Sequence, residues 1–195
     1  MVEKILENIP SALIKQADDQ GSTSLHYAAS LDRSYIIKLL LKNDRALAYM
    51  KDKKGRTALH IAAYERSALK MKEILSSCPD CCEIVDESGW NALHVVVNSP
   101  RDDWDNRALR VILDRSSFNH LLNEKDVDGS TPLHHHSKSS QYLKDLMCHD
   151  RVDKMAFNKE NLDAYDIALT NSKLSDQKGQ QELYCSPSLA KNDFL

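Results

Sequence analysis

The sequence has few glycines, no long apolar run and no signal peptide. Only 5 of its 195 residues are glycine, and they form no Gly-rich phosphate-binding loop. Apolar runs are short, such as Leu39–Leu41 and Val95–Val97, whereas a membrane-spanning helix needs roughly 18 or more apolar residues. The first residues, Met1–Lys4, lack the basic region and the apolar core of a signal peptide. These absences predict a chain without a membrane span.

The chain also lacks a surplus of positive charge and an even set of cysteines. Its 26 basic and 29 acidic residues give a net charge of −3, which argues against a general nucleic-acid-binding protein. The one dense basic stretch, residues 51–56, is interpreted as a solvated hairpin tip. The 5 cysteines are an odd number, and the repeat scaffold does not need them, so we expect a reducing, cytoplasmic setting.

What the sequence does have is one phrase that recurs. The pattern Gly-x-Thr-x-Leu-His begins at Gly21, Gly55 and Gly129, and it also begins at Gly89 with Asn91 in place of the threonine. Its histidines are 34 residues apart twice and then 40 residues apart, which indicates six inserted residues. A period near 33 with this phrase is typical of the ankyrin repeat, which consists of a β-turn and two antiparallel helices. The sequence therefore predicts an all-α ankyrin-repeat solenoid, a scaffold for binding and not for catalysis.

The repeat phase divides the chain into segments. An Asp-x-x-Gly turn opens each full copy, and a degenerate fifth copy begins at Asn158. We expect an incomplete N-terminal repeat, four repeats, a half repeat and a disordered polar tail. The corresponding segments are residues 1–17 (a second helix only), 18–51, 52–85, 86–125 with an insertion at 98–105, 126–157, 158–170 and 171–195. The incomplete ends predict an internal piece of a longer protein or a truncated gene product.

The invariant positions of the phrase predict structural roles. Glycine allows a positive φ in the turn, threonine or asparagine caps the first helix, and the histidine bonds to backbone and threonine groups. These residues are Gly21, Thr23, His26, Gly55, Thr57, His60, Gly89, Asn91, His94, Gly129, Thr131 and His134. A zinc site at His135 or His136 is the alternative, but consecutive helical side chains point about 100° apart and converge poorly.

The cysteines at positions 78, 81 and 82 have a spacing that also occurs in redox and zinc sites. A thioredoxin-type motif needs a βαβ setting, and a closed zinc site needs four ligands. The sequence around Cys78, Cys81 and Cys82 offers neither. A metal or redox module remains the less favoured alternative, and we predict no catalytic residue, metal or cofactor.

Recognition of another protein is the remaining function. The contact positions expected for such repeats are the turn residues and the outward end of the first helix. They include Lys53, Lys54, Arg56, Tyr64, Glu65, Glu87, Trp90, Asp128 and Ser130. Tyr64 and Trp90 are the expected anchors, because aromatic residues dominate interface energetics. Packing on the adjacent hairpin is the alternative for Trp90, and Trp104 in the insertion is a weaker candidate.

Two linking segments indicate a particular family of ankyrin-repeat proteins. They are residues 77–86 (Ser-Cys-Pro-Asp-Cys-Cys-Glu-Ile-Val-Asp) and residues 158–168 (Asn-Lys-Glu-Asn-Leu-Asp-Ala-Tyr-Asp-Ile-Ala). With the repeats, they resemble the plant ankyrin-repeat membrane proteins that end in a Pro-Gly-Gly domain, including the accelerated-cell-death and salt-tolerance types. The resemblance implies cytosolic repeats, held at the plasma membrane by C-terminal helices, that act in defence or stress signalling. This chain has no Pro-Gly-Gly motif. A fragment of a multi-pass membrane signalling or channel-like protein is therefore the alternative function.

Overall fold

The computed structural model describes residues 10–31, 33–100, 106–139 and 143–170. It forms two compact units, Met1–Leu121 (unit 1) and Leu122–Leu195 (unit 2), which are treated separately below. Within the described residues the regular structure is helical, without strands, and one isolated antiparallel bridge joins Ala17 to Thr23. None of the described helices has both the length and the apolar character needed to cross a bilayer.

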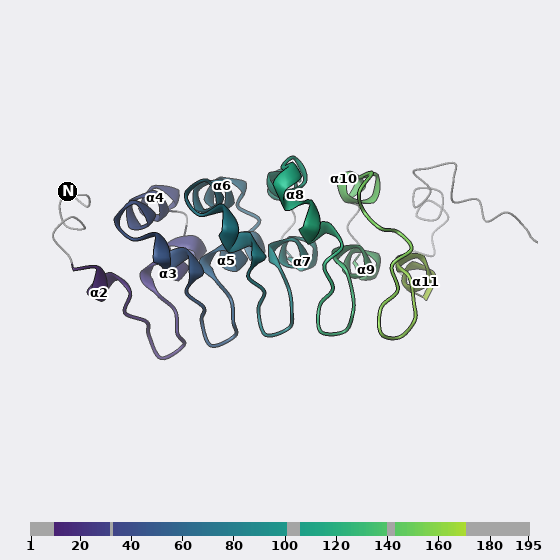
Figure 1. The fold of residues 1–195 in the computed structure, drawn as a ribbon, viewed down its shortest axis with the longest axis horizontal. Helices are drawn as coiled ribbons and strands as arrows, with labels where there is room; N and C mark the ends of the chain where they lie inside the picture. The colour runs from purple at the N-terminus through teal and green to yellow at the C-terminus, as the bar shows by residue number, and fades with distance from the viewer. Residues whose placement is uncertain (1–9, 32, 101–105, 140–142, 171–195) are drawn as a thin grey trace, which may run out of the picture. The chain divides into compact units, whose positions relative to one another are not determined.

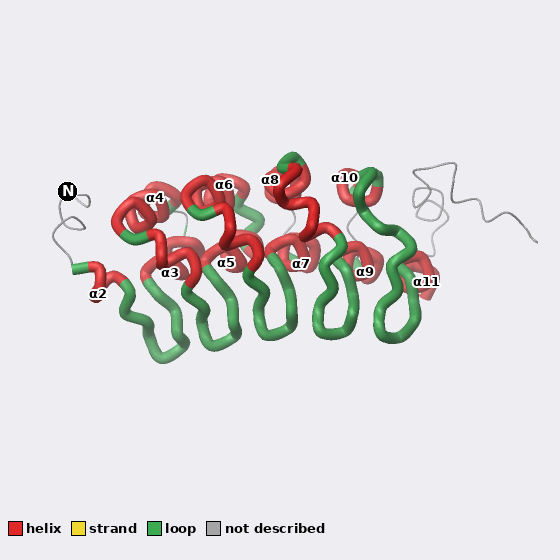
Figure 2. The backbone as a smooth tube through the Cα atoms, in the orientation of Figure 1, coloured by secondary structure: helices red, strands yellow, loops and turns green. Residues whose placement is uncertain are grey.

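Unit 1 contains three helix pairs, each followed by a 3-10 helix (Figure 1). A single-turn helix, α2 (Ser11–Ile14), precedes them. The pairs and 3-10 helices are α3 (Ser24–Ser30), α4 (Ser34–Asn43) and η1 (Arg45–Tyr49); α5 (Ala58–Tyr64), α6 (Ala68–Ser77) and η2 (Pro79–Glu83); and α7 (Ala92–Asn98), α8 (Arg107–Leu113) and η3 (Ser116–Leu122). Figure 2 shows the loops between successive repeats as hairpins that project away from the helices.

The helices of unit 1 form two layers. The first helices of successive repeats, α3, α5 and α7, pack side by side, and the second helices, α4, α6 and α8, do the same. Leu25, Leu59 and Leu93 fill the first layer with no exposed surface. The buried alanine pairs at 28–29 and 62–63 allow the neighbouring helices to approach closely.

Each first helix begins at a reciprocal cap. Thr23, Thr57 and Asn91 have extended backbones at the N-cap, and the histidine three residues later bonds back to the N-cap backbone. This arrangement satisfies donors that a helix start otherwise leaves unpaired. The repeat phrase therefore fixes where each first helix begins.

Unit 2 is built on the same plan but has fewer elements. Its helices are α9 (Pro132–Lys138), α10 (Lys144–Met147) and α11 (Ala164–Thr170). Pro132 occupies the first turn of α9, where its missing N–H costs nothing. The first helices α9 and α11 pack together, and α10 is only one turn long.

Leu69 is an exception to the burial of apolar residues on α6: it is 57% exposed, because it lies in the first turn on the side away from Met71 and Ile74. Several sequence-based expectations cannot be compared with the structure. Of the helix expected within residues 1–17, residues 1–9 lie outside the described part, which includes α2. Most of the insertion with Trp104, and the whole of the tail from 171, also lie outside it.

Candidate protein-binding surface

The hairpins of unit 1 are held by an aspartate that accepts two backbone hydrogen bonds. Asp52 Oδ1 accepts from the N–H groups of Lys54 and Arg56, at 2.9 Å each. Asp18 and Asp86 make the equivalent bonds in the other two hairpins, at 2.8–2.9 Å. The glycine that follows each aspartate has a φ of 74–77°, a region that L side chains rarely adopt. The turn shape is thus encoded locally in each repeat.

Backbone bonds also join one hairpin to the next. The Lys53 N–H donates to the Gln20 carbonyl at 2.9 Å, and the Glu87 N–H donates to the Lys54 carbonyl at 3.1 Å. These bonds leave the side chains at the tips exposed, namely Asp19, Gln20, Lys53, Lys54, Glu87 and Ser88. The charge along the tips therefore alternates from acidic to basic and back to acidic.

Two repeat histidines of unit 1, His26 and His60, use both ring nitrogens inside the fold. His60 Nδ1 accepts from the Thr57 N–H at 3.1 Å and lies 2.9 Å from Thr57 Oγ1. Its Nε2 lies 2.9 Å from the Trp90 carbonyl, which can only accept, so Nε2 carries the proton. Burial lowers the pKa of His60. His26 makes the same three contacts with Thr23 and the Arg56 carbonyl. A ring with both nitrogens engaged has no lone pair left for a metal or a substrate.

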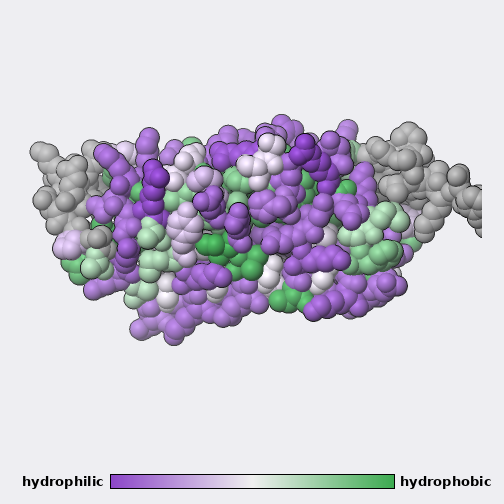
Figure 3. Space-filling view, viewed as in Figure 1, coloured by the Kyte–Doolittle hydropathy of each residue, from purple (hydrophilic) through white to green (hydrophobic). Residues whose placement is uncertain are grey.

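Aromatic and aliphatic side chains are exposed on the first helices beside the hairpins. Tyr27 on α3 is 52% exposed, Leu31 after α3 is 57% exposed and Tyr64 at the end of α5 is 48% exposed. In the view of Figure 3 the surface is mostly hydrophilic, and apolar residues form small separate groups. We call Tyr27, Leu31 and Tyr64, with the tip residues Lys53 and Lys54, the unit 1 strip.

Tyr27 is held in place by its own repeat. Its hydroxyl donates to Asp18 Oδ2, and this bond lowers the pKa of Asp18 and raises that of Tyr27. An exposed aromatic ring that is already fixed loses little conformational entropy on binding. Sequence analysis did not single out Tyr27. The sequence feature that could have identified Tyr27 is its position nine residues after the turn aspartate Asp18, because this spacing brings the two side chains together.

The residues expected to contact a partner are exposed to different degrees. Lys53, Lys54, Tyr64, Glu87 and Asp128 are exposed, with Asp128 in unit 2. Arg56, Glu65 and Trp90 are half-buried. Arg56 bonds to Asp52 Oδ2 through Nε at 2.8 Å, so its guanidinium helps to hold the hairpin. Ser130 is only 2% exposed, which corrects its assignment as a contact residue.

Asp52 remains ionised in this setting. Burial opposes its charge, but the hydrogen bonds from the Arg56 side chain and backbone outweigh burial and lower the pKa of Asp52. The Arg56 Nη2 atom lies 2.7 Å from Asp52 Oδ2. The basic character of the second hairpin tip therefore comes from Lys53 and Lys54 more than from Arg56.

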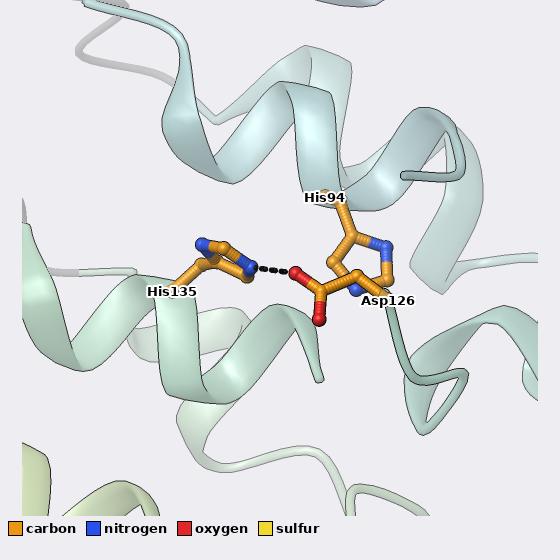
Figure 4. A group of neighbouring side chains, drawn as sticks. All are labelled: His94, Asp126 and His135. Atoms are coloured by element: carbon orange, nitrogen blue, oxygen red, sulfur yellow. Dashed lines mark hydrogen bonds and ion pairs between the residues drawn. The ribbon is translucent and has the colours of Figure 1, made fainter. Parts of the chain in front are cut away.

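The turn aspartate of unit 2 has a different partner. Asp126 Oδ1 accepts from the N–H groups of Asp128 and Ser130, at 2.9 and 2.8 Å. Its Oδ2 lies 2.7 Å from His135 Nε2, a pair that Figure 4 shows as a dashed line. His135 stands at the same spacing from its turn aspartate as Tyr27 does from Asp18.

The three neighbouring cysteines lie in the interior of unit 1. Cys78, Cys81 and Cys82 are free thiols with 2%, 0% and 3% exposure. Burial raises the pKa of Cys78 and of Cys81, which favours the unreactive thiol over the nucleophilic thiolate. The Cys78 thiol donates to the Arg45 carbonyl at 3.6 Å. This environment argues against a redox centre.

We expect Cys78, Cys81 and Cys82 to resist alkylation in the folded protein, because all three thiols are buried and burial raises the pKa of Cys78 and of Cys81. Iodoacetamide labelling at pH 7.5 followed by peptide mass spectrometry measures this directly. The same cysteines should label fully in 6 M guanidinium chloride, roughly the range that unfolds hyperstable proteins. Rapid labelling in the native state would reopen the redox alternative, and a melting temperature lowered by EDTA would point to a bound metal.

Comparison with known protein families identifies ankyrin repeats (many copies) over residues 25–75. This match runs from α3 to α6 and so includes the second hairpin and Tyr64. No curated protein matches the chain significantly. The chain contains ankyrin repeats, and its fold class is the all-helical ankyrin-repeat solenoid. Repeats of this class are generally interaction modules without catalytic activity.

Proposed function

We propose that this ankyrin-repeat chain is a non-catalytic scaffold that binds another protein through the unit 1 strip. The observation that carries the proposal is the exposure of Tyr27 and Tyr64 on neighbouring first helices. The hydrogen-bonded hairpins place Lys53 and Lys54 at exposed tips of the same stack. Fixed aromatic groups supply contact area, and the flanking charges select the partner.

The wider role that we propose rests on the resemblance noted in the sequence. The linking segments 77–86 and 158–168 resemble those of plant ankyrin proteins in defence and stress signalling. We place the chain in the cytoplasm. The second candidate is a fragment of a multi-pass membrane signalling or channel-like protein. A transcript that continues into apolar helices would favour this candidate.

We expect the double substitution Tyr27→Ala and Tyr64→Ala to weaken partner capture at least about tenfold, as loss of interface hot spots does. The measurement is quantitative mass spectrometry of proteins retained by the immobilised chain, followed by a titration with the retained partner. Helical circular dichroism should be unchanged, because both side chains are exposed.

The matched control is Tyr49→Ala. Tyr49 is also an exposed tyrosine, 42% accessible, but it lies on η1 outside the unit 1 strip. It should retain every partner of the unchanged chain. If the double variant kept full affinity while the Tyr49 variant lost it, the binding surface would lie on the 3-10 helices instead.

A further inference from the structure

The first helix of unit 2 contains three consecutive buried histidines. His134, His135 and His136 on α9 are 1%, 8% and 5% exposed. His134 is the repeat histidine, but the next two positions are Tyr27-Ala28 in the first repeat, Ile61-Ala62 in the second and Val95-Val96 in the third. Titratable side chains have thus replaced a tyrosine or apolar residues in the interior of unit 2.

His134 is held in its neutral form by its contacts. Its Nδ1 accepts from the Thr131 N–H at 3.1 Å and lies 2.7 Å from Thr131 Oγ1. Its Nε2 lies 3.1 Å from the Leu162 carbonyl and must therefore carry the proton. A second proton on Nδ1 would remove the lone pair that caps α9. Burial lowers the pKa of His134 and outweighs the backbone hydrogen bonds with Leu162 and Ala156, which act to raise it.

His136 has no such network. Its Nδ1 is buried without a hydrogen-bond partner among the described residues. Burial alone lowers the pKa of His136 to about 4. The titratable groups of the neighbouring elements are Tyr165 and Asp166 on α11, Asp163 before it, and Lys144 and Asp145 on α10. Asp163 and Asp166 accept each other's backbone N–H at the start of α11, at 2.8 and 3.2 Å. A proton on His136 would therefore add an uncompensated buried charge.

His135, unlike His136, has a hydrogen-bond partner for its ring. Its Nε2 is 2.7 Å from Asp126 Oδ2, and the side chain of Asp126 is 1% exposed. Burial opposes ionisation of Asp126, but the bonds from His135 and from the backbone outweigh it and lower the pKa of Asp126. A protonated His135 would thus face an existing carboxylate, and its charge would be compensated.

We propose that α9 is an acid-sensitive element that opens when His134 and His136 are protonated, and that the pair of His135 and Asp126 does not drive this opening. Unfolded histidines are neutral above roughly pH 6.5. A depressed folded pKa means that the folded state binds fewer protons than the open state between the two pKa values. Stability is therefore fully present above about pH 6.5 and is lost as the pH falls toward the folded pKa.

The effect of His136 can be stated as a fold-change. A folded pKa of about 4 and an open-state pKa of about 6.5 favour opening about 30-fold more at pH 5 than at pH 7.5. His134 adds to this factor in the same direction. Because only open helices exchange their amide hydrogens, the factor is measurable as faster exchange in α9.

Hydrogen exchange of the peptide that covers residues 131–138, corrected for intrinsic rates, tests the proposal on the full chain. At pH 5 relative to pH 7.5 we expect at least about a 30-fold gain in opening. Two variants, His136→Ala and His136→Met, should each lose most of this pH-dependent gain in opening, whatever their absolute stability. Methionine fills more of the space that the histidine leaves. The matched control His135→Val, which introduces the third-repeat residue, should retain it.

Two results would overturn the proposal. One is a native chain whose α9 amides open equally at both pH values. The other is a pair of His136 variants that keep the full gain, which would place the acid response elsewhere in the chain. A measured loss of the gain in the His135→Val variant would instead assign the response to the pair of His135 and Asp126, contrary to the proposal.

Discussion

Replacement of His60 by alanine is expected to lower the free energy of unfolding by about 3 kcal/mol, because buried polar groups would lose their partners. His60 is 1% exposed and joins two repeats of unit 1. The substitution would leave the Thr57 N–H without its partner in the interior, and it would remove one of the donors to the Trp90 carbonyl, which also accepts from the Asp86 N–H. It would also remove the side chain that caps α5.

Urea unfolding followed by circular dichroism measures this loss. The control is Tyr64→Ala in the same helix, which removes an exposed side chain and should change stability by less than about 0.5 kcal/mol, as exposed substitutions usually do. His60→Asn tests whether hydrogen bonding matters more than volume, and it should recover part of the loss. An unchanged midpoint in His60→Ala would mean that the histidine bonds contribute little to the stack.

The substitution Gly55→Ala is expected to lower the free energy of unfolding by about 3 kcal/mol as well. The new methyl group would stand on a left-handed backbone and would also overpack its surroundings. Gly55 has a φ of +74°, and a Cβ there would lie 2.8 Å from the Glu87 backbone nitrogen and 3.1 Å from the Asp86 carbonyl carbon. Both neighbours are backbone atoms of the next hairpin and cannot rotate away. The second and third hairpins must therefore separate, which weakens the bond between the Glu87 N–H and the Lys54 carbonyl.

Thermal and urea unfolding of this variant should be compared with Lys54→Ala at the same tip. Lys54 is exposed and does not require a positive φ, so its loss should have little effect on stability. Gly21→Ala should cause a smaller loss of stability than Gly55→Ala, since its Cβ would lie 3.0 Å from the Lys53 backbone nitrogen, against 2.8 Å for the closest contact at Gly55. If Gly55→Ala were as stable as Lys54→Ala, the hairpins would be less tightly packed than described.

The repeat phrase predicted most of the fold because each of its residues acts locally. The glycine, the N-cap residue and the histidine determine the turn and the helix start within a few residues, and the periodic leucines determine the buried face. Leu69 does not follow this pattern and is exposed, because an apolar residue in a first turn can lie on either side of the helix.

The candidate surface was less predictable than the fold. Exposure of Tyr64 followed from its position at the end of a first helix, whereas the burial of Ser130 depends on tertiary packing. Tyr27 was missed because its bond to Asp18 joins a helix to the preceding turn. The histidines at 135 and 136 looked like a failed metal motif in the sequence. Their different hydrogen bonding became visible only in three dimensions.

The bonds between neighbouring hairpins of unit 1 have a consequence for evolution. The two bonds at the tips, from Lys53 to Gln20 and from Glu87 to Lys54, use main-chain atoms only. Every amino acid except proline supplies the same N–H, so almost any side chain can replace those at positions 53 and 87 without breaking a bond. New binding preferences can therefore arise by single substitutions at the tips, at little cost to folding, and a descendant of this gene can change its partner while it inherits the stack intact.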